Sequence, residues 1–103
     1  MQNRIETLRK MVDARPSDPR ARFGLALEYE RLRRWDDVVT TLTEYLEMAD
    51  DEGNAYGRLA LALRELGRDD EARDAYRMGI EAAHRHGHPT MAMEFEETLA
   101  EME

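Results

Sequence analysis

The sequence repeats itself with a period of about 34 residues, and this constrains its fold more than any other feature. A shift by one period places Leu25, Leu59 and Met93 in register, and Ala26 falls on Ala60 in the same way. A period of this length is typical of arrays in which each repeat is a pair of helices that buries its apolar side against its neighbours.

The apolar residues within each period recur at helical spacing, so two helices are expected per repeat. In the first period we expect helices over residues 19–32 and 36–49, with Asp18 as the N-cap, Pro19 at the first helical position and a turn at residues 33–35. In the second we expect helices over 54–66 and 69–84, separated by Gly67 in a left-handed conformation.

The second period resembles the tetratricopeptide repeat. The matching residues are Tyr56-x-x-Leu59-Ala60-x-x-Leu63-x-x-x-Gly67-x-x-x-Glu71-Ala72-x-x-x-Tyr76, and the first period repeats part of this pattern as Leu25-Ala26-x-x-Tyr29 and Trp35-Asp36-Asp37-Val38. The first period departs from the family at Arg33, where the family prefers glycine, and at Val38 and Tyr45, where it prefers small residues. The resemblance implies an all-α solenoid of antiparallel helical hairpins.

The two ends of the chain continue the same register. Residues 2–14 align with the second helix of a repeat, and residues 88–102 align with the first. We therefore expect six helices in a single domain: an N-terminal helix in 1–18, repeats at 19–52 and 53–86, and a C-terminal capping helix in 87–103. Arg4, Glu94 and Glu97 stand where a further helix would dock, so both end helices are interpreted as caps with a polar outer face.

By resemblance to the family, the first helices of the repeats line a concave groove that binds a peptide or a partner helix. Arg58 and Arg64 would engage acidic groups there, and Gly57 would leave a gap in the apolar wall. The alternative is that the apolar side chains of this set only pack neighbouring helices together. The candidate peptide-binding residues are Phe23, Leu27, Gly57, Arg58, Leu61, Arg64, Met91 and Phe95.

Composition excludes several other functions. The net charge of −8 argues against nucleic acid as the partner, and no apolar run reaches the roughly 18 residues of a membrane span. With no cysteine, disulfides and thiolate-bound zinc are excluded. His84, His86 and His88 alternate near a helix end and are interpreted as helix-end residues, not as metal ligands. We expect a cytoplasmic protein without cofactor, metal or catalytic activity, since no convergent polar motif is present.

Two functions remain open from the sequence, and neither identifies the partner. The first is an adaptor or scaffold that binds a peptide segment of another protein. The second is self-association, either as a symmetric dimer that buries Met91, Phe95 and Leu99, or as a head-to-tail stack of charged ends. Residues 1–34 hold nine basic and five acidic residues, whereas residues 35–103 hold six and eighteen. Because exposed charge pairs are weak and screened by salt, the apolar dimer is favoured over the stack.

Overall fold

A computed structural model describes residues 3–103, which contain six α-helices and no strand. The helices are α1 (Asn3–Ala14), α2 (Pro19–Arg31), α3 (Trp35–Met48), α4 (Asn54–Glu65), α5 (Asp69–Arg85) and α6 (Pro89–Met102). This confirms the all-α prediction, with every described helix ending close to the expected position. Residue 2 of the expected N-terminal helix lies outside the described residues. Trp35 was expected in a turn but is the first residue of α3.

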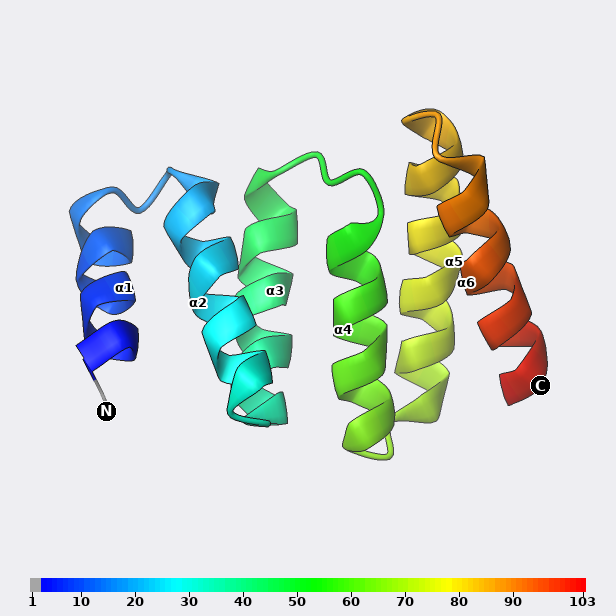
Figure 1. The fold of residues 1–103 in the computed structure, drawn as a ribbon, viewed down its shortest axis with the longest axis horizontal. Coiled ribbons are helices and arrows are strands. Elements are labelled where there is room, and N and C mark those ends of the chain that lie inside the picture. The colour runs from blue at the N-terminus through cyan, green and yellow to red at the C-terminus, as the bar shows by residue number, and fades with distance from the viewer. Residues whose placement is uncertain (1–2) are drawn as a thin grey trace. The chain divides into compact units, whose positions relative to one another are not determined.

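The chain divides into two compact units, one ending at Ala49 and the other spanning Asp50–Glu103. In the first unit α2 packs against both α1 and α3, and in the second α5 packs against both α4 and α6. Figure 1 shows the helices of each unit side by side, with the chain reversing direction at each connection within a unit. Within the described residues, none of these helices is long and apolar enough to cross a membrane.

The helices α2, α4 and α5 end in the same backbone arrangement, which reverses the chain without using side chains. At the end of α4, the Arg68 N–H donates to the Leu63 carbonyl over 2.8 Å and the Gly67 N–H donates to the Arg64 carbonyl over 2.9 Å. Gly67 has φ +75°, as predicted, and this pair of bonds is the Schellman arrangement. The ends of α2 and α5 repeat it, with Arg33 and Gly87 as the left-handed residues.

Carboxylates begin α2 and α4 by accepting hydrogen bonds from free backbone N–H groups. The Asp18 Oδ1 accepts from the Arg20 N–H over 3.0 Å at the start of α2. Before α4, the buried Asp51 Oδ2 accepts from the N–H groups of Gly53 and Ala55, both over 2.8 Å. These acidic residues therefore cap helices, as the sequence indicated for Asp18.

The core of each hairpin is made where small or apolar residues recur at the same position of successive repeats. Ala26 and Ala60 are both fully buried, as are Val38 and Ala72, which occupy one register position of α3 and α5. Small side chains at these positions let the paired helices approach closely, and each buried methyl group contributes about 1 kcal/mol of hydrophobic stabilisation.

A buried carboxylate breaks this pattern in the first unit. Glu28 is 6% exposed, whereas its counterpart in the next repeat is Ala62. Its carboxylate accepts from Arg31 on the same helix, and the Arg4 Nε lies 2.8 Å from Glu28 Oε1. The hydrogen bond from Arg31 is the main reason that the pKa of Glu28 is lowered. Arg4, interpreted from the sequence as a residue of the outer cap, thus also ties α1 to α2.

Candidate functional site

The eight candidate groove residues are distributed over both units. Phe23 and Leu27 lie on α2, in the first unit. The remaining six lie in the second unit, on α4 and α6: Gly57, Arg58, Leu61, Arg64, Met91 and Phe95.

Phe95 of α6 packs into a notch made by two glycines. A Cβ placed on Gly57 of α4 would lie 2.7 Å from two carbons of the Phe95 ring, and one placed on Gly79 of α5 would lie 3.0 Å from the ring. The ring centroid also lies 5.7 Å from that of Tyr76, in a tilted arrangement. The space expected beside Gly57 is therefore filled by Phe95, which is half-buried and joins three helices.

Met91, one turn before Phe95 on α6, packs in a similar way. Its sulfur would lie 2.8 Å from a Cβ placed on Gly53, which precedes α4 and has φ +128°. Met91 is half-buried, and Arg58 on α4 is half-buried as well. Both apolar residues of α6 in the candidate set thus contribute to packing within the second unit.

Leu61 and Arg64 instead face an open pocket of about 450 Å³. Leu61 is 37% exposed, and the Arg64 Nη1 donates to the Tyr76 hydroxyl over 3.4 Å, which raises the pKa of Arg64. The pocket therefore offers an apolar contact beside charges of both signs. Its lining comes from the end of α4, the start of α5 and the end of α6: Leu61, Arg64, Glu65, Asp69, Arg73, Glu101 and Met102.

In the first unit, one candidate residue packs against a neighbouring helix and the other is exposed. Phe23 is half-buried, with its ring centroid 5.1 Å from that of Tyr45 on α3. Leu27 is 36% exposed. Leu27 and Leu61, which occupy the same position of successive repeats, thus have nearly the same exposure.

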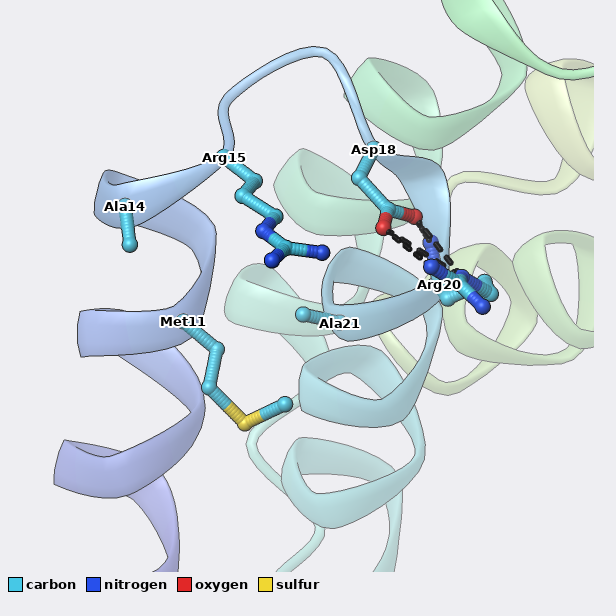
Figure 2. A pocket seen from close by; sticks show the side chains of 6 residues that line it. All are labelled: Met11, Ala14, Arg15, Asp18, Arg20 and Ala21. Carbon is cyan, nitrogen blue, oxygen red and sulfur yellow. Dashed lines mark hydrogen bonds and ion pairs between the residues drawn. The ribbon is translucent and has the colours of Figure 1, made fainter.

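A second pocket of about 530 Å³ lies between α1 and the start of α2, and sequence reasoning missed it. Figure 2 shows the Met11 and Arg15 side chains reaching into the space between the two helices, with Asp18 bound to Arg20 at its edge. The lining residues are Met11, Ala14, Arg15, Asp18, Arg20 and Ala21. The available sequence signal was Met11, an apolar residue that follows Arg9 and Lys10 and is 51% exposed in the structure.

Two of the three histidines pair with carboxylates of the segment before α4. His86 Nε2 lies 3.2 Å from Asp50 Oδ2, and His88 Nε2 lies 3.2 Å from Glu52 Oε2. Arg85 also contacts Asp50 over 3.0 Å. No group of three or more metal-binding side chains comes together anywhere in residues 3–103.

Comparison with known proteins gives a likeness in structure only. No protein-family model matches the sequence, and no curated protein matches it significantly. Solved structures titled "MamA MSR-1 C2" and "MamA AMB-1 C2221" both superpose with a TM-score of 0.67 at 22% identity. They cover 95% and 96% of this chain, which spans 64% and 66% of theirs. At this identity the likeness shows the fold alone, an all-α helical repeat of the tetratricopeptide type.

Proposed function

We propose that this chain is a protein-interaction module that binds a peptide or an amphipathic helix through the first helices of its repeats. The observation that carries the proposal is the pocket beside Leu61 and Arg64, where an exposed apolar side chain lies next to two guanidinium groups and three carboxylates. An apolar anchor flanked by an acidic residue fits such a surface, since the anchor buries Leu61 and the carboxylate pairs with Arg64. Leu27 supplies the equivalent exposed contact on α2.

In this proposal the other candidate residues shape the site. Phe95 and Met91 hold α6 against α4, and Gly57 admits the Phe95 ring. Arg58 lies one turn before Leu61 on α4 and extends the basic character of the helix. Binding requires no cofactor and no chemical step.

Selection of binders from a displayed peptide library on the immobilised protein tests this function. The selected peptides should share an apolar residue near an acidic one, and Leu61→Ser should weaken their binding by roughly tenfold, the loss expected for one central apolar contact. Met78 on α5 is 55% exposed and does not line the pocket, so Met78→Ser is the matched control and should bind normally. Equal loss in both variants, or no enrichment, would contradict the proposal.

A further inference from the structure

Helices α1 and α6 each expose a face whose counterpart in the α4·α5 hairpin is buried between the two helices. In the α4·α5 hairpin, the facing residues lie at similar distances from the Gly67 turn, and a Cβ on Gly79 would lie 3.1 Å from the Tyr56 Cβ. Leu63 and Ala72, on either side of the turn, are both buried. This hairpin gives the geometry with which a first helix and a second helix of a repeat pair.

Helix α6 aligns with α4 after a shift of one repeat. The α4 face that packs against α5 therefore has a counterpart on α6. The α4 residues on the face toward α5 are buried or half-buried, but their α6 counterparts are all exposed. Met93, the counterpart of Leu59, is 57% exposed. The exposed α6 counterparts are Pro89, Thr90, Met93, Glu94 and Glu97.

Helix α1 aligns with α5 after a shift of two repeats. The α5 face that packs against α4 therefore has a counterpart on α1. The α5 residues toward α4 are all buried, whereas only Leu8 among their α1 counterparts is even half-buried. The Arg4 side chain is 76% exposed, although it reaches Glu28. The α1 counterparts are Arg4, Thr7, Leu8, Met11 and Arg15.

The two exposed faces are complementary in charge, since Glu94 and Glu97 lie on the α6 face and Arg4 and Arg15 on the α1 face. Counted towards the turn from the Tyr56–Gly79 pair, the antiparallel register sets Leu63 opposite Ala72. The same geometry sets Glu97 of α6 opposite Arg4 of α1. Thr90 of α6 is the counterpart of Tyr56, and Met11 of α1 is the counterpart of Gly79. The same geometry therefore sets Thr90 opposite Met11. The outward face of α6 carries carboxylates and no basic residue, so two α6 faces repel each other, and Arg4 and Arg15 oppose the pairing of two α1 faces.

The pocket between α1 and α2 is the place that such a partner would fill. Its equivalent in the second unit lies between α5 and α6 and is occupied by Gly53, from the segment before α4. A Cβ on Gly53 would lie 3.2 Å from the Gly79 carbonyl oxygen and 3.4 Å from the Ala83 Cβ. The counterparts of Gly79 and Ala83 are Met11 and Arg15, which line the open pocket in Figure 2.

We infer that α6 of one molecule docks on α1 of a second copy, so that the two helices complete one repeat between molecules. Gly87, the counterpart of Gly53, then enters the pocket beside Met11 and Arg15, and Glu97 pairs with Arg4 of the second copy. The contact joins two different surfaces, so it repeats head to tail and forms a ring or a filament. It uses neither Leu61 nor Arg64 and does not depend on the peptide-binding proposal.

Cysteine cross-linking tests this geometry, because the sequence contains no native cysteine. Thr90→Cys combined with Met11→Cys places two sulfurs at the counterpart of the Tyr56–Gly79 pair, whose Cβ atoms would lie 3.1 Å apart. A separation larger by a few tenths of an ångström reaches the roughly 3.5–4.5 Å that a disulfide needs. Mild oxidation should give a ladder of covalent dimers, trimers and higher species. Met78→Cys with Met11→Cys, which pairs an exposed residue outside the proposed face, should give no ladder. Equal products from both pairs, or only a cross-linked monomer, would overturn the inference.

Charge reversal provides a second measurement that does not require a new bond. Sedimentation velocity should show growth of the assembly with concentration at low salt and its loss at high salt. Glu97→Arg should weaken association by roughly fivefold. Adding Arg4→Gln to that variant should recover part of the loss, because it removes the repulsion between two guanidinium groups without placing a second carboxylate beside Glu28. Glu81→Arg is the matched control, since Glu81 is an exposed carboxylate on α5 away from this face. Monomers at every concentration, or equal loss in Glu81→Arg, would contradict the docking.

Discussion

The least expected single residue is Arg33, which adopts φ +57° at the end of α2. Its counterpart Gly67 holds the same left-handed conformation after α4, where glycine carries no Cβ to clash with the following carbonyl. The sequence already marked Arg33 as a departure from the family pattern. The structure shows that the backbone keeps the turn geometry in spite of the substitution.

Arg33→Gly should therefore stabilise the protein by about 1 kcal/mol, because it removes the cost of a side chain in the left-handed region. Gly67→Ala should destabilise it by a similar amount, for the opposite reason. Chemical denaturation measures both values. Arg33→Ala is the control, since it removes the guanidinium but keeps the Cβ, and it should leave stability nearly unchanged. Stabilisation by Arg33→Ala as large as that by Arg33→Gly would assign the effect to the charge.

Asp18 should make the stability of the first unit depend on pH. Hydrogen bonds from the Arg20 side chain and backbone lower the pKa of Asp18 to about 2, from a usual value of 3.8. A carboxyl whose pKa is lowered by folding stabilises the native state above its unfolded pKa, and this contribution is lost as the pH falls from about 4 towards 2. Arg20→Gln should reduce the fall in melting temperature over this range. Arg15→Gln, which removes a nearby charge that makes no hydrogen bond to Asp18, should change it less.

At the scale of the helices, the two glycines inside α2 and α4 have opposite surroundings. A Cβ on Gly24 would meet only the Leu8 Cδ2 at 3.4 Å, an ordinary contact, whereas a Cβ on Gly57 would press on the Phe95 ring at 2.7 Å. Both sites gain up to about 1 kcal/mol of helix propensity when glycine becomes alanine.

Gly24→Ala should consequently stabilise the protein by roughly 0.5–1 kcal/mol. Gly57→Ala should destabilise it, because overpacking costs about 1–3 kcal/mol and exceeds the gain in propensity. Equilibrium unfolding of the two variants checks this. In a Phe95→Ala background the clash is absent, so Gly57→Ala should become stabilising there. A cost that persists in that background would show that Phe95 is not its cause.

Phe95→Ala alone should lower stability by about 2 kcal/mol, less than the roughly 3–5 kcal/mol for a fully buried phenylalanine. The ring is half-buried and contacts both α4 and α5, so the loss falls on the packing of the second unit. Urea unfolding followed by circular dichroism measures this value. A change below about 0.5 kcal/mol, the range of ordinary surface substitutions, would show that the ring packs loosely.

Much of the helix layout could be predicted from the sequence, because register, caps and glycine turns are local signals. Asp18 and Gly67 marked helix ends by the hydrogen bonds that they or their backbone could make. The fate of Phe95 could not be predicted, because its burial depends on two glycines from different helices meeting at one place. The pocket beside Met11 was missed for the same reason, since it needs the α1–α2 geometry as well as the pattern.

At the scale of the whole molecule, protection of backbone amides should differ between middle and end helices. Within the second unit α5 packs against α4 and α6, whereas α6 packs mainly against α5. Local opening of a singly supported helix breaks fewer contacts. Hydrogen exchange of the dilute protein should therefore be slowest in α5 and faster in α6, and in the first unit slower in α2 than in α1. Exchange in α6 as slow as in α5 at low concentration would contradict this.

Hydrogen exchange measured at several protein concentrations also tests the docking of α6 on α1. If α6 docks on α1 of another copy, then raising the protein concentration should slow exchange in α1 and α6 together and leave α5 unchanged. Slowing confined to one of the two helices would instead indicate a symmetric contact.

The notch that holds Phe95 also has a mechanical consequence. Two smooth helices can slide along each other at little cost, but a ring seated against Gly57 and Gly79 must leave its seat before α6 can move by even one residue. The same aromatic side chain that contributes to packing thus resists sliding of α6 along its neighbours. Under a stretching force, α6 should peel away from its end and should not slip along its length.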